Sequence, residues 1–305
     1  EKIVFYPGTQ PATIFSRRYD HQKKISVIEF GAKIKISSQG EEAIQLKTLK
    51  NTSVFAAYKQ VNISIPVMER VIDWFGKSFM SSINPYHSLT QFSDREIQKN
   101  PKIKEHALKF LKEADLNITD VTFEDMVRKV DNDFLKMLDT APIPEEQKAK
   151  IREEKAIHYQ QTVFQHKIVK EGKEEYHTLP EQRQSQGTMR YYGLSAPFFH
   201  AIGNNAFLPI DEIGSALHPL LIIHFLKEFL RKSEKAQLLF TTHNISLLNE
   251  KDILRKDAIW FTEKEEDGAT ALYSMADFNF RKELSFYNAY KIGKFGAIPN
   301  LNTPY

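Results

Sequence analysis

Two short apolar segments, each followed by polar residues, constrain the fold of this sequence most. Residues 206–212 read Ala-Phe-Leu-Pro-Ile-Asp-Glu, and residues 237–244 read Gln-Leu-Leu-Phe-Thr-Thr-His-Asn. Between them, residues 219–232 alternate apolar and charged side chains at helical spacing and begin with a proline, which is common at the first helical position. A strand, a helix and a strand of these lengths make one crossover unit, so we expect two adjacent parallel strands.

The polar residues at the ends of the two segments predict a site. A buried parallel strand delivers its last residue to the edge of the sheet where ligands bind, so Asp211 is placed to hold Mg²⁺ through water. Glu212 could polarise an attacking water, and His243 would lie near both. The two acids serve one site only if the chain turns after the strand, which Gly214 would permit. Pro209 argues against a central strand, because it removes a backbone donor, and a plain acidic turn is the alternative.

A third segment lies just upstream. Ser185-Gln186-Gly187-Thr188 precedes an expected helix over 189–202. A hydroxyl and free backbone N–H groups at a positive helix end make an anion site. The same pattern is also typical of an ordinary helix cap. The functional interpretation therefore depends on the position of the segment just before the acidic strand.

The rest of the chain divides into three expected parts of an α/β protein. Residues 1–42 read as strands of an antiparallel β-meander. Residues 43–160 are expected to be a helical insertion or arm, whose strongest helical run extends from Thr122 as N-cap to Leu138. Residues 161–305 alternate helices and strands, as expected of a lobe with parallel strands.

Composition excludes several classes of protein. The 305 residues contain no cysteine, which excludes disulfides, a thiol nucleophile and a cysteine-rich zinc site and fits a cytoplasmic location. No apolar run approaches the ~20 residues of a membrane helix, and no signal peptide is recognisable at the start. The net charge of +3 is too small to argue for nucleic acid by itself.

The order of these motifs carries a family resemblance. Ser-Gln-Gly-Thr (185–188), Leu-Pro-Ile-Asp-Glu-Ile-Gly-Ser-Ala-Leu-His-Pro (208–219) and Phe-Thr-Thr-His-Asn (240–244) resemble the ABC-type ATPases of the OLD and chromosome-maintenance lineage. The chain looks most like the ATPase subunits of bacterial abortive-infection and toprim-partnered phage-defence systems. Its ending, with residues 259–264, 268–270 and Lys-Phe-Gly-Ala-Ile-Pro at 294–299, also looks like that group.

The resemblance implies a role for each motif. Ser185 and Gly187 would form the signature that touches the γ-phosphate of ATP held by a second subunit. Asp211 of the Walker B strand would serve Mg²⁺, Glu212 would be the catalytic base, and His243 would be the switch histidine.

The segment from Ser215 to His218 would be the D-loop at a dimer interface. The implied cofactors are ATP and Mg²⁺. The signature departs from the longer Leu-Ser-Gly-Gly-Gln form of transporters, which argues against transport.

One expected motif is absent from the sequence. A phosphate-binding P-loop needs Gly-x-x-x-x-Gly-Lys-Ser/Thr after a strand. The nearest string is Trp74-Phe75-Gly76-Lys77-Ser78, where Val71 occupies the position of the first glycine and the context is an amphipathic helix. The fold is therefore expected to be an ABC-type P-loop NTPase fold that lacks its P-loop part. Because an apolar pattern already runs at Glu1, we expect the P-loop upstream in the same polypeptide.

Several functions remain compatible with these motifs. The first is an ATP-hydrolysing sensor or regulator of a toxic effector, such as a nuclease, in antiviral defence, acting as a homodimer or larger homo-oligomer. A DNA-repair or chromosome-maintenance ATPase with nucleic acid as a possible partner, and a non-catalytic scaffold without a P-loop, are the alternatives. A self-contained nuclease with a fused toprim domain is disfavoured, because the chain ends soon after the ATPase motifs.

Overall fold

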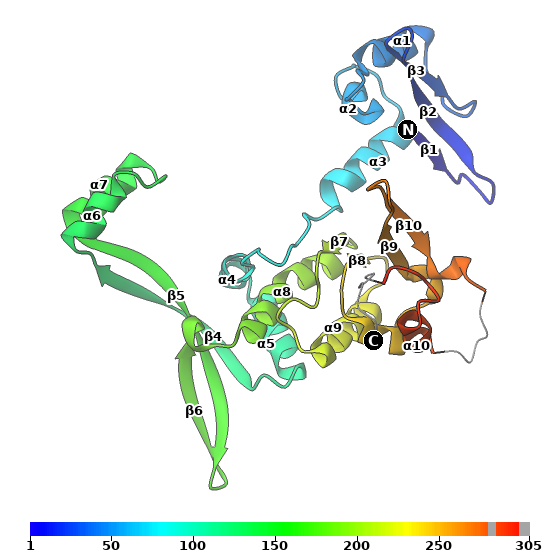
Figure 1. The fold of residues 1–305 in the computed structure, drawn as a ribbon. Coiled ribbons are helices and arrows are strands. Elements are labelled where there is room, and N and C mark those ends of the chain that lie inside the picture. The colour runs from blue at the N-terminus through cyan, green and yellow to red at the C-terminus, as the bar shows by residue number, and fades with distance from the viewer. Residues whose placement is uncertain (280–284, 299–305) are drawn as a thin grey trace. The chain divides into compact units, whose positions relative to one another are not determined.

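Residues 1–80 form one of two units into which the computed structural model divides the chain, and residues 81–305 form the other; the structure describes residues 1–279 and 285–298. In the first unit, β1 (Lys2–Phe5), β2 (Ala12–Asp20) and β3 (Ile25–Phe30) form an antiparallel sheet in that order, drawn in blue in Figure 1. The predicted β-meander is thereby confirmed.

Three helices complete the first unit: α1 (Ser38–Lys47), α2 (Val54–Tyr58) and α3 (Pro66–Lys77). Its core is made by fully buried side chains of the sheet and of all three helices, among them Phe15, Ile44, Val54 and Met68. Gly76 lies inside α3, so the Gly-Lys-Ser string has the helical context that the sequence predicts rather than that of a P-loop.

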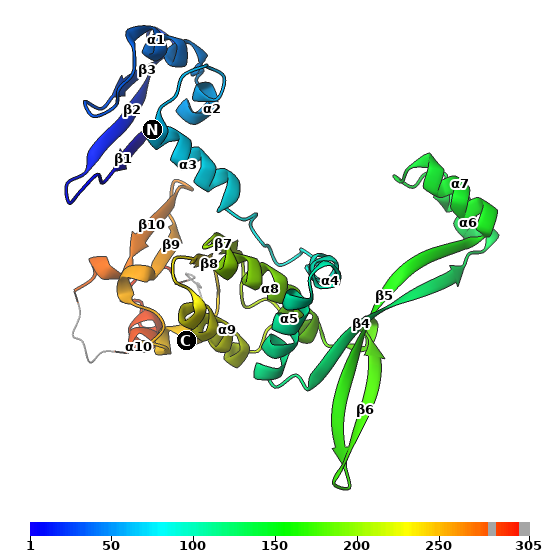
Figure 2. The ribbon, with the colours of Figure 1, turned by 180° about the vertical axis from the view of Figure 1, so that it is seen from behind.

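The second unit is built around α8 (Gln186–Gly203), which packs against α4 (Thr90–Lys99) and α5 (Pro101–Glu113). Figure 2 shows these helices from behind. Every residue of α8 from Arg190 to Phe198 is buried, as expected of a helix that other elements surround. Aromatic rings fill the contacts: Phe110 stacks on Tyr191 with ring centroids 4.3 Å apart, and Phe198 meets Phe225 edge-on at 5.3 Å.

The crossover unit predicted from the sequence is confirmed. β7 (Phe207–Ile210) and β8 (Gln237–Phe240) are adjacent parallel strands, and α9 (Pro219–Lys232) connects them. Ile83 pairs in parallel with Ile210 on the other side of β7. The carbonyl of Pro209 accepts a hydrogen bond from Ile83 N–H at 3.0 Å. Proline is tolerated here because its missing N–H points to the side where pairing is a single bridge rather than a ladder.

A long antiparallel sheet was not predicted. β4 (Ile118–Lys129), β5 (Ala156–Lys170) and β6 (Lys173–Pro180) pair in that order. The segment that connects β4 to β5 contains α6 (Asn132–Leu138) and α7 (Glu145–Glu154), which lie at one end of this strand pair (Figure 1).

The helix expected from Thr122 to Leu138 is therefore wrong over its first half. Thr122 lies within β4, and the helix that follows is α6, whose N-cap is Asp131. The apolar residues between 122 and 138 that fit helical spacing belong to a strand, a turn and a helix in succession. β4 instead pairs with β5 from Ile118↔His166 to Lys129↔Ala156, and this long ladder outweighs a weak local preference. Residues 145–156 are also charged and helix-prone in sequence; α7 covers them as far as Glu154, and β5 begins at Ala156.

The last part of the chain adds a small cluster. β9 (Trp260–Lys264) and β10 (Thr270–Ser274) pair antiparallel, and α10 (Phe286–Lys291) follows. Phe295 stacks on Phe261 with centroids 5.4 Å apart, so two segments of the predicted family-like ending meet, while Pro299 lies outside the described residues. The short 3₁₀ helices are Glu181–Arg183, Ile245–Asn249, Lys256–Ala258 and Met275–Asp277. A search of the described residues finds no helix with the length and apolar character needed to span a membrane.

Candidate functional site

Asp211 follows β7 directly, and one threonine fixes how the chain leaves the strand. The Thr241 hydroxyl, which follows β8, donates a hydrogen bond to Asp211 Oδ1 at 2.6 Å. The same hydroxyl oxygen accepts the N–H of Glu212 at 2.9 Å. The backbone of Thr241 also bonds on both sides, donating to Ile210 and accepting from Ile213. Thr241 therefore holds both acidic residues in place at the carboxyl end of the strand pair.

Glu212 turns the chain. Its φ is +49°, a left-handed conformation that costs a residue with a side chain about 1 kcal/mol or more. The prediction that the chain turns after the strand is confirmed, but Gly214 is not the residue with positive φ. A Cβ at Gly214 would instead lie 3.2 Å from Ile222 Cδ1, so a glycine here avoids crowding against the side chain of Ile222.

The turn brings Glu212 to His243. Glu212 Oε1 lies 3.1 Å from His243 Nε2, and the histidine side chain is 96% exposed while that of Glu212 is 29% exposed. Asp211 contacts Thr241 and Glu212 contacts His243, two residues further along. Both acids thus face the segment after β8, and the structure brings Asp211, Glu212 and His243 together as predicted.

A cavity of about 370 Å³ opens at this edge. It is lined by Pro85, Glu212, Gly214, Ser215, Thr242, His243 and Asn244. A pocket at the carboxyl ends of parallel strands is where open α/β sheets bind their ligands. A carboxylate and an imidazole 3.1 Å apart at a solvent-open cavity can accept or pass a proton, and the exposed carboxylate of Asp211 can hold a cation. Within residues 1–279 and 285–298, no group of three His, Cys, Asp or Glu side chains is arranged so that it could hold a metal ion by itself.

Ser185 is the N-cap of α8. Its Oγ accepts the N–H of Thr188 at 3.0 Å and lies 2.9 Å from the Thr188 hydroxyl. Ser185 is exposed, and the ordinary helix cap that the sequence offered as an alternative is present, while the anion site stays a prediction.

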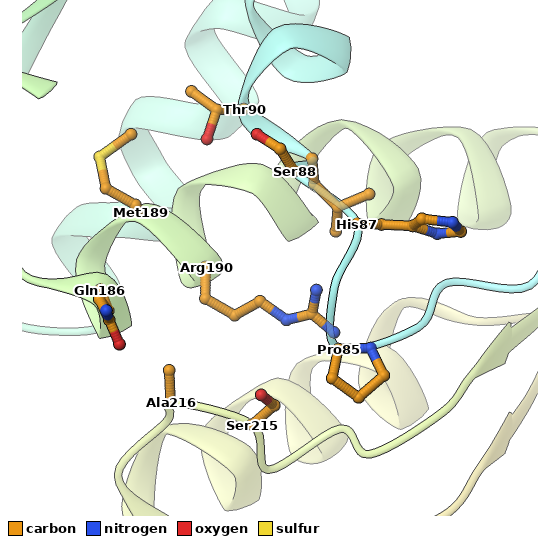
Figure 3. Close-up of a pocket in the computed structure, with 10 residues that line it drawn as sticks. Pro85, His87, Ser88, Thr90, Gln186, Met189, Arg190, Ser215 and Ala216 are labelled. Carbon is orange, nitrogen blue, oxygen red and sulfur yellow. The ribbon is translucent and has the colours of Figure 1, made fainter.

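Gly187 lies against the segment that follows the acidic pair. A Cβ on Gly187 would stand 2.8 Å from the carbonyl oxygen of Ala216, which is closer than side chains allow. Ala216 itself has a φ of +61°. Gln186 and Ser215 line a second cavity beside this contact, and Figure 3 shows Gln186 of α8 opposite Ser215 and Ala216. The first turn of α8 and residues 215–216 therefore pack as one piece within a single chain.

The two ends of the predicted D-loop, Ser215 and His218, differ in their position relative to the cavities. Ser215 lines both cavities, whereas His218 is the N-cap of α9, and its Nδ1 accepts the N–H of Leu220 at 3.3 Å. Of the described residues named as site candidates, four do not line the cavity at Glu212: Ser185, Gly187, Asp211 and His218.

Sequence reasoning missed Thr241 as the residue that braces the acids and Arg190 as a buried charge. The signal for Thr241 was its place directly after the second strand. That for Arg190 was a single arginine before a helix segment that is otherwise uncharged up to residue 199.

Comparison with known families places the chain. The family model described as "AAA domain, putative AbiEii toxin, Type IV TA system" matches residues 11–249, which is most of the chain. AAA domains are ATPases in general and use ATP and Mg²⁺. A search of curated proteins finds no match.

Proposed function

The chain belongs to this family of AAA domains, and from that membership we propose that it is an ATPase subunit that supplies the acidic, histidine and signature parts of an ABC-type site. One observation carries the proposal most. Asp211, Glu212 and His243 converge at the carboxyl ends of two adjacent parallel strands, where Glu212 and His243 line an open cavity.

The residues present fit a nucleotide and its metal. Mg²⁺ is commonly held by one or two carboxylates together with substrate phosphates and water, so one exposed aspartate is enough. Bound Mg²⁺ would neutralise the charge that develops on the transferred phosphoryl group. Asp211 would hold that ion through water, while the Thr241 hydroxyl keeps one carboxylate oxygen of Asp211 oriented.

Glu212 would accept the proton of the attacking water. Its left-handed backbone, braced by Thr241, aims the carboxylate into the cavity beside His243. His243 is exposed and its Nε2 lies 3.1 Å from Glu212 Oε1, so it is placed to orient the same water or to contact the terminal phosphate.

The site is proposed to be shared between two copies. Ser185 and Gly187 lie at the exposed end of α8 and outside the cavity at Glu212, which suits contact with nucleotide on a second subunit. Ser215 and Ala216 link the two halves within one chain, because Ala216 contacts Gly187 and Ser215 lines the cavity at Glu212. A two-fold dimer is the commonest closed arrangement for such a shared site.

The biological role is proposed from the family and the motifs. The family description names a putative AbiEii toxin of a type IV toxin–antitoxin system, and we propose that this chain is a sensor or regulator of a toxic effector in abortive infection. A scaffold that does not hydrolyse ATP is the second candidate, favoured by the absence of a Gly-x-x-x-x-Gly-Lys-Ser/Thr string from the sequence. The predicted domain boundaries after residues 42 and 160 stay predictions.

The test is steady-state ATP hydrolysis beside nucleotide affinity, measured on the native full-length protein. Glu212→Gln should lower turnover ~10²-fold or more, the usual size of a general-base effect, with ATP still bound. Asp211→Asn should weaken binding of Mg²⁺–ATP. Glu234→Gln, at an exposed position between α9 and β8, is the matched control and should change neither. Hydrolysis by Glu212→Gln at the wild-type rate would remove Glu212 as the base, and tight binding without any wild-type hydrolysis would favour the scaffold.

A further inference from the structure

Arg190 is a buried charge without a full set of partners. It lies in the second turn of α8, and only 8% of its surface is exposed. Its Nη1 donates to the carbonyl oxygen of Asn84 at 3.2 Å. Its Nε and Nη2 are buried and bond to none of the described residues. Figure 3 shows the side chain extending from α8 toward Pro85 along the second cavity.

A guanidinium in this state is costly. A buried donor without an acceptor destabilises the folded chain, and the penalty is larger when the donor is charged. Burial lowers the pKa of Arg190 for the same reason, because the charged form is poorly solvated. Of the residues that line the cavity, none is an aspartate or a glutamate. The described residues thus supply no acidic partner for Arg190 at this cavity.

The cavity has the size and lining of a small-molecule site. Its volume is about 340 Å³, and small-molecule pockets start at about 300 Å³. Around Arg190 it presents hydrogen-bonding groups from Ser88, Thr90, Gln186 and Ser215. The two free donors of Arg190, Nε and Nη2, stand on one edge of the guanidinium, the edge that grips two oxygens of a carboxylate or phosphate.

We propose that this cavity binds a small oxyanion, a phosphate or carboxylate group, through the Nε and Nη2 edge of Arg190. The proposal goes beyond the ATPase site, because neither Asp211 nor Glu212 lines this cavity. Because Nε and Nη2 are buried, binding requires a displacement of the segment beside Arg190, residues 84–89, which is neither helix nor strand. Because Gln186 and Ser215 also line the cavity, a bound anion would hold the first turn of α8 against residues 215–216.

The direct test is titration of the native full-length protein with inorganic phosphate, AMP and malonate, followed by the Nε–H resonance of Arg190 in NMR. Saturable shifts with phosphate or AMP identify a phosphate group as the ligand, and shifts with malonate alone identify a carboxylate. No saturable shift with any of the three overturns the proposal.

Variants separate this site from the nucleotide site. Arg190→Met should reduce anion affinity at least 10-fold, and without anion it should be at least as stable as wild type, because an unpaired buried charge is replaced by an apolar chain. Arg190→Lys keeps the charge without the two-pronged edge and should bind more weakly than wild type. Thr90→Val removes one hydroxyl that lines the cavity, and it is the milder variant to use if Arg190→Met does not fold. Unchanged anion affinity in both Arg190→Lys and Thr90→Val would contradict the proposal.

Asp211→Asn is the control for the proposed ATPase. It should bind the anion as wild type does, even if the Glu212 mechanism is wrong. Loss of anion binding in Asp211→Asn, with binding intact in Arg190→Lys, would assign the anion to the nucleotide site and overturn the separate cavity. Arg190→Met that is less stable than wild type, together with no anion binding by the wild type, would make Arg190 a structural residue.

Discussion

Two glycines in α8 allow the contact between the signature segment and residues 215–216 to be tested. Gly187, in the first turn, has the carbonyl oxygen of Ala216 2.8 Å from where a Cβ would be. Gly203, at the other end of the same helix, has no atom within 4 Å of that position. Both glycines lack positive φ, so an alanine suits the backbone at either place. The two substitutions differ only in what the new methyl group meets.

The expected magnitudes follow from that difference. Replacing a helical glycine by alanine stabilises by up to about 1 kcal/mol, so Gly203→Ala should raise stability slightly. Gly187→Ala gains the same helix-propensity stabilisation, but overpacking costs about 1–3 kcal/mol. The methyl group meets the backbone carbonyl oxygen of Ala216, which moves less easily than a flexible side chain. The net change for Gly187→Ala should be a loss of about 0–2 kcal/mol, because the first turn of α8 must shift away from Ala216.

Urea unfolding measures the first effect and ATP hydrolysis the second. We expect Gly187→Ala to be less stable than Gly203→Ala and to hydrolyse ATP more slowly, while Gly203→Ala keeps the wild-type rate. Equal stability and equal rates in the two variants would refute the close contact between Gly187 and Ala216 and, with it, the link between signature and acidic pair within one chain.

Two further predictions concern residues that hold the site. Thr241→Val keeps the shape of the side chain but removes the hydroxyl that bonds Asp211 Oδ1 and the Glu212 N–H, so ATP turnover should fall at least several-fold. Stability should change by about 1 kcal/mol or less, since water can replace these exposed bonds. Thr178→Val, at an exposed position of β6, is the control, and equal turnover in the two variants would show that Thr241 does not hold the acids in place. His106, stacked on Phe110 and Phe198, has its pKa lowered by burial from 6.5 to about 4, so the unfolded chain binds more protons between these values. The stability from this residue is complete above about pH 6.5 and is lost as the pH falls toward 4, by about 2 kcal/mol at pH 5. His106→Phe should therefore lose less stability than wild type between pH 7 and pH 5 in urea unfolding, and an identical loss would show that His106 is not buried in its neutral form.

The crossover unit was predictable because local and global preferences agree there. The runs before Asp211 and Thr241 are short, apolar and bounded by turns, and the helix between them begins at Pro219, so each signal supports the same parallel pair. The convergence of Asp211, Glu212 and His243 follows from that pairing.

The remaining features depend on contacts distant in sequence. β4 is a strand because β5, more than twenty-five residues further on, pairs with it, and the local spacing from Thr122 also fits a helix. The left-handed backbone of Glu212 was not foreseen, because no glycine or asparagine marks it. The sequence did not indicate that the Nε and Nη2 donors of Arg190 lack acceptors, since a lone arginine on a helix is normally solvated or paired.

The shared site is the central claim, and mixing two inactive variants tests it most directly. Glu212→Gln keeps the signature and loses the base, whereas Ser185→Arg keeps the base and blocks the signature. In a mixed dimer one site combines both intact parts, so an equal mixture should recover roughly a quarter of the wild-type ATPase rate, because half of randomly paired dimers are mixed and each has one complete site of two. A mixture no more active than the two variants measured separately would contradict the account.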